Sequence, residues 1–391
     1  MRHRHFRYSR RRFLSSAAAV AVLPAFFVSG CGMADQAHQS GQTGTNALAF
    51  QEPSASTPLS VEAARGRLRF GTAVHDNVIR PGSQSRSIIA AQCSSVTPEW
   101  SLKWNSLAPR PHTYNFAGAD ACSSFAASQG LAMRGHTLLW HLGTPAWAER
   151  LIADTREWEH VDNHIARVVS RYRSRVREWD VINEPISGRG DGDLRANQFL
   201  AAFGPDYLDW AFHSAARYAD GADLFLNEYG LEYANPEDSR KRLALLRAVE
   251  GLRNRGAPIT GVGLQAHLDL RKGNIYQNGV YGLVRDLTDM GLKVAVTELD
   301  VRESDTRMSL NRRDSLVADT VHRYLETVLQ FPSVESVSTW GLSDAHSWLL
   351  YHDGGHPDNR GLPYDRQWRP KPMRATIASL LGQYRPDIVS P

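Results

Sequence analysis

The chain has 391 residues, of which 42% are hydrophobic and 22% charged, as is usual for a soluble globular protein. Its formal net charge is +4. Residues 1–30 contain six arginines and no acidic residue, so the rest of the chain carries 4 − 6 = −2. The basic excess therefore belongs to the N-terminal arm. The net charge therefore gives no reason to expect nucleic acid, and no nucleic-acid partner is predicted.

Residues 1–31 have the pattern of an export signal. Residues 9–14, SRRRFL, resemble a twin-arginine motif, and the apolar stretch 13–28 is shorter than the about 20 residues of a membrane span. Residues 28–31, VSGC, resemble a bacterial lipobox, in which Cys31 is lipidated; a cleaved signal with a chance cysteine is the alternative. We expect a periplasmic or outer-membrane-anchored lipoprotein, or a secreted protein, with no membrane contact beyond this anchor.

Residues 32–60 are rich in Ser, Thr, Gln, Gly and Pro, which predicts a flexible linker. Residues 61–391 show no later break of this kind, so one domain is predicted there. Its two cysteines, Cys93 and Cys122, form no C-x-x-C motif, which argues against a zinc or dithiol redox site. Their apolar surroundings favour buried thiols, and a disulfide between them stays open.

Within the predicted domain, short apolar runs rich in β-branched residues alternate with helical patterns. Eight repeats of strand then helix predict a closed (β/α)₈ barrel, and an open doubly wound sheet is the alternative. No G-x-G-x-x-G follows the first strand, as dinucleotide binding would require. The expected strands are 69–74, 94–99, 131–140, 176–184, 222–229, 258–268, 293–301 and 334–344.

Two glutamates stand where predicted strands end. Glu184 follows the apolar run of WDVINEP (179–185), and Glu298 lies in KVAVTELDV (293–301). A salt bridge is the simplest explanation of either alone. In a barrel, however, both would point into one mouth from opposite sides of the ring, and paired carboxyls across a cavity are the working groups of glycoside hydrolysis.

The motifs taken together resemble glycoside hydrolase family 10, the endo-1,4-β-xylanases. They are VTPEWSLKW, RGHTLLWH followed by PAW, WDVINEP, LFLNEY, GVGLQAHL, VTELDV, WGLSDAHSWL and YDRQWRPKP, in family order from about residue 61 to 373. The resemblance implies a retaining enzyme acting on xylan-type polysaccharide, with Glu184 as acid and base and Glu298 as nucleophile. His267 and Asp300 would hold the nucleophile, and Asn183 would bond the sugar 2-hydroxyl. The substrate-binding residues implied are Glu99, Lys103, His136, Trp140, Asn227, Tyr229, Gln265, Trp340 and Trp348.

No metal or cofactor is predicted. His136 and His141 lack a third ligand at a suitable spacing for zinc. The acidic stretch GRGDGDL (188–194) is better explained as a solvated turn than as a calcium loop. We expect the protein to be a monomer.

The sequence departs from the family pattern at three places. Trp100 stands where the family has Asn, Leu142-Gly143 where it usually has Ser-Gln, and Gly230 where Asn is common. The first two concern residues that bond the sugar one place beyond the cleaved unit, so we expect an altered chain-length or side-branch preference. Two other functions stay open: a related barrel β-glycosidase acting on another glycan, and a surface glycan-binding protein without catalysis.

Overall fold

The computed structural model describes residues 57–189, 193–351 and 355–384. The predicted signal, the lipidation site Cys31 and nearly all of the predicted linker lie outside the described residues, as does the centre of the acidic stretch 188–194. None of the described helices combines the length and apolarity needed to cross a bilayer.

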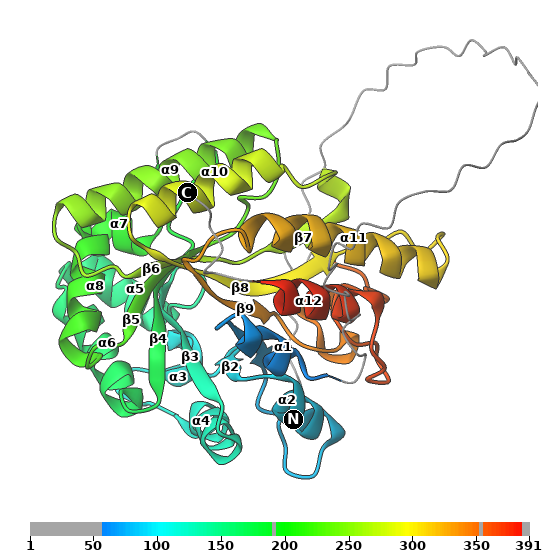
Figure 1. Cartoon of the computed structure of the whole chain (residues 1–391). Coiled ribbons are helices and arrows are strands. Elements are labelled where there is room, and N and C mark those ends of the chain that lie inside the picture. Colours follow the sequence, from blue (N-terminus) through cyan, green and yellow to red (C-terminus); the bar gives the residue numbers. More distant parts are fainter. Residues whose placement is uncertain (1–56, 190–192, 352–354, 385–391) are drawn as a thin grey trace, which may run out of the picture. The chain divides into compact units, whose positions relative to one another are not determined.

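In the described part of the chain, all strand pairings are parallel and the sheet closes on itself (Figure 1). The order is β6-β5-β4-β3-β2-β1-β9-β8-β7, and β6 also pairs with β8, which completes a ring of eight positions. The predicted (β/α)₈ barrel is therefore confirmed. The strands are β1 (Arg69–Val74), β2 (Ser95–Pro98), β3 (Ala132–Trp140), β4 (Val176–Asn183), β5 (Asp223–Glu228), β6 (Gly261–Leu264), β7 (His267–Asp269), β8 (Lys293–Arg302) and β9 (Val334–Thr339).

The sixth predicted strand, 258–268, is wrong as a single element. The ladder stops at Leu264 and resumes at His267, because Ala266 adopts a left-handed backbone with φ 59°. Such a backbone is costly for a residue with a Cβ and breaks an extended strand. The two short strands β6 and β7 that result both pair with β8.

Helices alternate with the strands and surround the barrel (Figure 1). Several begin at a side-chain cap, as when Asn235 accepts a hydrogen bond from Asp238 N ahead of Pro236, a favourable start for a helix. The helices are α1 (Leu59–Arg65), α2 (Gln84–Gln92), α3 (Trp104–Leu107), α4 (Ala117–Gln129), α5 (Ala146–Thr155), α6 (Glu159–Tyr172), α7 (Gln198–Phe203), α8 (Tyr207–Tyr218), α9 (Pro236–Asn254), α10 (Gln277–Asp289), α11 (Leu310–Val328) and α12 (Pro372–Gln383), with 3-10 turns η1 (Leu270–Lys272), η2 (Asp344–His346) and η3 (Trp348–Leu350).

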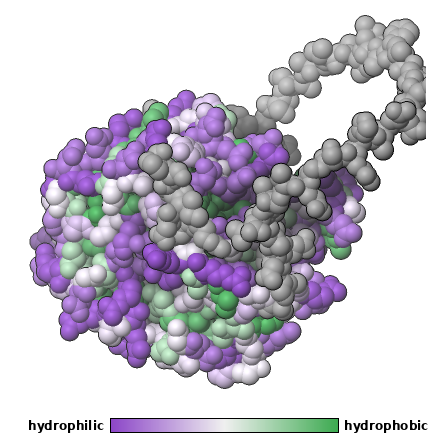
Figure 2. All heavy atoms as spheres, in the orientation of Figure 1, coloured by the Kyte–Doolittle hydropathy of each residue, from purple (hydrophilic) through white to green (hydrophobic). Residues whose placement is uncertain are grey.

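The barrel strands are apolar and buried along nearly their whole length, as expected for parallel strands covered by helices. Trp179 of β4 is fully buried and lies against Gly135 of β3, where a Cβ would come within 2.1 Å of the indole. Cys93 and Cys122 are both buried and unpaired, so the two thiols are not joined. The face seen in Figure 2 carries hydrophilic residues with apolar ones between them.

Candidate active site

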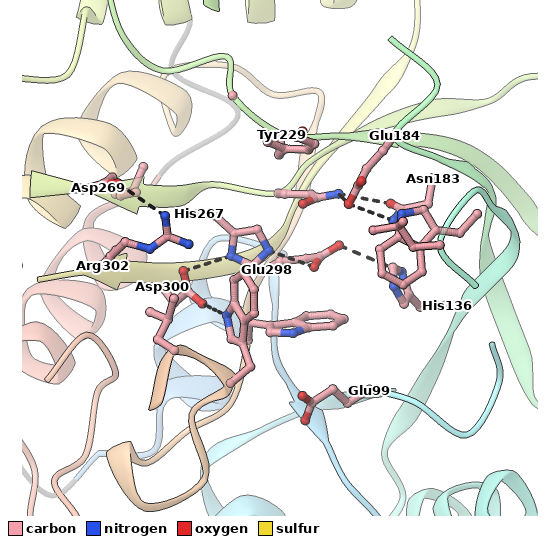
Figure 3. Close-up of a pocket in the computed structure, with 18 of the residues that line it drawn as sticks. Glu99, His136, Asn183, Glu184, Tyr229, His267, Asp269, Glu298, Asp300 and Arg302 are labelled. Carbon is pink, nitrogen blue, oxygen red and sulfur yellow. Dashed lines mark hydrogen bonds and ion pairs between the residues drawn. The ribbon is translucent and has the colours of Figure 1, made fainter. Parts of the chain in front are cut away.

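A cavity of about 570 Å³ opens at the carboxyl ends of the strands, where (β/α)₈ barrels carry their active sites. Glu184 and Glu298 both line it (Figure 3). The two glutamates are not diametrically opposed, because the shorter way round the ring from β4 to β8 crosses only β5 and β6. The prediction that the two glutamates point into the mouth from opposite sides of the ring is therefore wrong.

Glu184 lies one residue beyond the end of β4, with a left-handed backbone at φ 59°. Three contacts hold this unfavourable conformation. Glu184 N donates to Asn227 O (2.8 Å), and Arg195 Nε donates to Glu184 O (2.8 Å). Two residues on, Ile186 N donates to Glu228 Oε2 (2.8 Å). The backbone of the strand end is thereby fixed, and the half-buried Glu184 carboxyl is turned into the cavity.

Glu298 lies inside β8 rather than at its end, and the ladder is irregular on both sides of it. Towards β6 and β7, regular pairing stops at Val296 and resumes at Asp300. Towards β9, the register shifts between Val296 and Leu299. Such bulges redirect side chains beside active sites. Glu298 is 4% exposed, so its carboxylate depends on protein partners for hydrogen bonds.

Three amide side chains connect the two glutamates. Asn227 Nδ2 donates to Glu298 Oε1 (2.6 Å) and to Asn183 Oδ1 (2.9 Å). Gln265 Nε2 donates to Asn183 Oδ1 (3.1 Å) and Glu184 Oε1 (3.3 Å), and Asn183 Nδ2 also donates to Glu184 Oε1 (3.3 Å). Each carboxylate therefore accepts amide hydrogens, and Asn183 connects the two sets of bonds.

The other oxygen of Glu298 faces a chain of three side chains (Figure 3). His267 Nε2 lies 3.1 Å from Glu298 Oε2, and His267 Nδ1 lies 2.9 Å from Asp300 Oδ1. Trp348 Nε1 donates to Asp300 Oδ2 (2.6 Å). Burial lowers the pKa of His267, but Asp300 and Glu298 outweigh it and raise the pKa to about 10. His267 is therefore a cation at neutral pH and donates to both carboxylates.

A second histidine lies on the other side of Glu298. His136 Nδ1 is 3.0 Å from Asp180 Oδ2 and 3.9 Å from Glu298 Oε1. Asp180 is bound in turn by Arg134, whose Nη2 lies 2.5 Å from Asp180 Oδ1. Burial raises the pKa of Glu298, yet the nearby His136 and the hydrogen bond from His267 lower it overall. Glu298 is therefore held ionised, which is the state that its predicted role as nucleophile requires.

Lys103 is enclosed by three indole rings at the cavity wall. Its Nζ lies 4.0 Å from the ring centre of Trp100, 4.5 Å from that of Trp140 and 5.9 Å from that of Trp340. The face of an indole attracts a cation. Burial lowers the pKa of Lys103, although Glu298 and Glu99 oppose the shift. For the Glu99 carboxyl the direction is opposite, and burial raises its pKa.

All of the catalytic and substrate-binding residues predicted from sequence line this cavity except Asn227. Asn227 is fully buried, and its amide atoms bond Asn183, Glu298 and the Thr297 hydroxyl. It therefore lies beneath the cavity rather than in its wall. Among residues 57–189, 193–351 and 355–384, no cluster of three His, Cys, Asp or Glu could hold a metal ion.

Other lining residues were not among the predicted site residues. One group follows β6, and the prediction of a single strand over 258–268, ending at Leu268, does not include it. Asp269 and Lys272 lie just beyond that end. The stretch DLRK (269–272) contains one acidic and two basic residues, and this cluster of charge is a signal of a site that the sequence offers. The lining residues that the sequence did not single out are Leu268, Asp269, Lys272, Arg302 and Leu349; Trp100, Leu142 and Gly230 also line the cavity and are the departures from the family pattern noted above.

The charged state of His267 leads to a first prediction. A ring ¹⁵N NMR titration is expected to show both nitrogens protonated through neutral pH, with a transition near pH 10. Because the folded-state pKa lies above the ordinary value, the stability that His267 contributes is complete below about pH 6.5 and is lost as the pH rises towards 10. Asp300→Asn should move the transition to lower pH, and a transition near pH 6.5 in the wild type would contradict the geometry.

Comparisons with known proteins identify the family of the chain. The model of glycosyl hydrolase family 10 matches residues 60–380, and the chain belongs to this family. Endo-1,4-beta-xylanase 2 of Aureobasidium pullulans is 33% identical over 334 residues, covering 82% of this chain and 89% of the relative. Endo-1,4-beta-xylanase B of Paenibacillus barcinonensis is 30% identical over 320 residues, covering 78% and 92%.

Solved structures give the same result for the fold. The native xylanase 10B of Thermotoga maritima aligns with TM-score 0.74 at 26% identity, covering 83% of this chain and 98% of that one. The endo-1,4-beta-xylanase of Caldicellulosiruptor owensensis aligns with TM-score 0.73 at 27% identity, covering 82% and 99%. A related mutant structure contains xylotriose (TM-score 0.73, 27% identity, covering 82% and 99%).

Proposed function

We propose that the protein is an endo-acting, retaining endo-1,4-β-xylanase that cleaves internal bonds of xylan. The observation that carries the proposal is the pair Glu184 and Glu298 in one cavity, with Glu298 bonded by His267 and Asn227. The relatives named above, described as endo-1,4-beta-xylanases, and the related structure with xylotriose support the choice of sugar.

In the proposed reaction Glu184 donates its proton to the leaving glycosidic oxygen while Glu298 attacks the anomeric carbon. A glycosyl ester on Glu298 results. Forming the ester removes the charge of Glu298, so Glu184 is free to act as base towards water, and the attack of that water releases the sugar with its configuration retained. Asn183, bonded to Gln265 and Asn227, is positioned to bond the sugar 2-hydroxyl.

A substrate panel tests the proposal. The purified domain is incubated with unbranched xylan, arabinoxylan and β-glucan, and reducing ends are measured. We expect internal cleavage of xylans, with a rapid fall in viscosity, and little release from β-glucan. Activity on β-glucan alone would favour a related barrel glycosidase, and binding without release of reducing ends would favour a non-catalytic glycan-binding protein.

We also propose that the subsite beyond the cleaved sugar is altered. Trp100 is 44% exposed and lies over Lys103, while Leu142 is 63% exposed at the rim. Gly143 has no side chain that could form a hydrogen bond. Its backbone oxygen is already engaged, because it accepts from Asn105 N (2.7 Å). At this end of the cavity, the large apolar side chains of Trp100 and Leu142 and the missing side chain of Gly143 thus replace hydrogen-bonding groups.

Trp100→Asn should partly reverse this change. Removal of the indole uncovers Lys103 and Glu99, so the ratio of kcat/KM on linear xylohexaose to that on xylotriose is expected to rise about tenfold, the effect of one or two hydrogen bonds. Trp210→Asn is the matched control, because Trp210 is 40% exposed on α8 and outside the cavity. A ratio equal in wild type, variant and control would refute the altered subsite, as would wild-type rates and products like those of ordinary family members.

We further propose that residues 1–31 are a twin-arginine signal ending at a lipidated Cys31, and that residues 32–60 tether a monomeric catalytic domain, 61–391, at the periplasmic or outer-membrane surface. Replacing Arg10 and Arg11 together by lysine is expected to leave active enzyme in the cytoplasm. Cys31→Ala should move activity from the membrane pellet to the soluble fraction. Unchanged fractionation of Cys31→Ala would show ordinary secretion instead.

A further inference from the structure

A second, smaller cavity adjoins the proposed active site. It has a volume of about 200 Å³ and is lined by residues that follow β1 and β2 and by residues of α3 and the start of α4. The two cavities share one lining residue, Trp100. The indole is therefore the partition between the cleft and this side pocket. The side pocket is below the usual 300–1,000 Å³ of small-molecule sites and suits a single sugar ring.

The side pocket offers hydrogen-bonding groups that no described contact uses. Ser106 Oγ and Asn115 Nδ2 make no hydrogen bond to any described residue, and Asn115 Oδ1 is engaged only by Ala117 N (3.0 Å). Asp76 uses Oδ1 for His75 Nδ1 and Asn77 N, which leaves Oδ2 available. The pocket thus presents two donors and a carboxylate acceptor within one small space.

The shared indole adds an apolar surface. Lys103 Nζ lies over the ring of Trp100 at 4.0 Å, yet Trp100 remains 44% exposed, so part of the indole is free to contact another group. A sugar ring presents apolar C–H groups beside its hydroxyls, and an aromatic ring next to hydroxyl and amide groups matches both.

The charge of the lining distinguishes between kinds of branch. Asp76 is the carboxylate of the lining, no lysine or arginine is among the residues that form it, and its one histidine, His75, is already paired with Asp76 (Nδ1 to Oδ1, 2.6 Å). The cation nearest to the partition, Lys103, lies in the main cavity and is enclosed by indoles. A uronic acid would bring a second carboxylate beside Asp76, whose Oδ1 already contacts His75 Nδ1, whereas a neutral sugar would bond Asp76 through hydroxyls.

We infer that this side pocket binds a neutral pentosyl branch carried by the main-chain sugar one place beyond the cleaved unit. The inference rests on the proposed xylanase function and deepens it. Trp100 then has two roles: its bulk replaces hydrogen bonds to the main chain, and its free surface supports the branch. The substrate class assigned is a xylan with arabinofuranosyl-type branches, in preference to linear or uronosyl-branched chains.

The test compares three oligosaccharides of equal main-chain length: linear, with one arabinofuranosyl branch, and with one uronosyl branch, each at the sugar one place beyond the cleaved unit. We expect wild-type kcat/KM to be about tenfold higher on the arabinofuranosyl-branched chain than on the linear one, the effect of one to two hydrogen bonds. Ser106→Phe, at an exposed position of α3, fills the side pocket and should abolish this preference. Ser87→Phe, at an exposed position of α2 outside both cavities, is the matched control and should retain it.

Each outcome has a defined meaning. Equal rates on the linear and arabinofuranosyl chains, or a preference that survives Ser106→Phe, would overturn the side pocket while leaving the xylanase proposal intact. An equal preference for the uronosyl branch would overturn the assignment to neutral sugars. If none of the three chains is hydrolysed, the xylanase proposal is contradicted. Binding of the same chains to Glu184→Ala, measured by calorimetric titration, then tests the side pocket separately. Equal Kd values for the linear and arabinofuranosyl-branched chains would overturn the side pocket.

Discussion

Replacing Glu298 by alanine is expected to lower kcat/KM on linear xylohexaose by a factor on the order of 10⁵, since the covalent step loses its nucleophile. The protein should remain folded, because the change removes a buried charge while Asn227 keeps Asn183 and His267 keeps Asp300 as acceptors. His267 loses one of its two acceptors, so its pKa should fall below that of the wild type. Reducing-end assays and the His267 titration measure both effects.

Two further observations make this prediction specific. Azide or formate added to Glu298→Ala should restore part of the activity on an activated aryl glycoside, and the product should have the opposite anomeric configuration. Glu335→Ala is the control, because Glu335 lies near the start of β9, away from the cavity, with ion pairs to Arg69 and Lys293. It should retain wild-type turnover, and activity that persists in Glu298→Ala would refute the assigned nucleophile.

Replacing Glu184 by alanine is expected to give the second large effect, with a dependence on the leaving group. On xylan, kcat/KM should fall about 10³-fold, since general acid catalysis contributes about 10²–10⁴-fold. On a dinitrophenyl xylobioside, whose leaving group needs no proton, the first step should be nearly unaffected. A burst of dinitrophenol followed by slow turnover is therefore predicted, because water has lost its base.

Stopped-flow absorbance resolves the burst, and the product of an azide reaction provides the control. Azide needs no base, so it should accelerate turnover of Glu184→Ala and yield a glycosyl azide with retained configuration. Equal losses on xylan and on the dinitrophenyl substrate would refute the role of Glu184 as acid. ¹H NMR of wild-type products at early times should show retention, which requires the two carboxyls to lie about 5–5.5 Å apart.

The barrel was predictable because its physical requirements are local in sequence. Parallel strands buried on both faces need continuous apolar runs, and those runs placed the boundaries of most strands within two residues. The match is close for 69–74, observed as Arg69–Val74, and for 293–301, observed as Lys293–Arg302. The last predicted strand, 334–344, ends earlier, at Thr339.

The remaining features depend on contacts between segments that are far apart in the sequence. The break between β6 and β7 arises at Ala266, and alanine gives no signal of a left-handed backbone, as glycine would. Asn227 was predicted to contact sugar, and its residue type suits either the wall or the floor of a cavity. The pocket behind Trp100 needs α3, α4 and the end of β1 together, a contact between segments that no motif records.

The irregular ladder around Glu298 determines how the chain can tolerate a change in length. Each β6 residue pairs with the residue 32 positions later, as Gly261 with Lys293, whereas His267 pairs with Asp300, 300 − 267 = 33 positions later. If the β6 register continued, His267 would face Leu299 instead. A single-residue deletion at Ala266 would therefore move His267 out of register with Asp300 and separate it from Glu298, whereas loops on the opposite rim can lengthen without this effect.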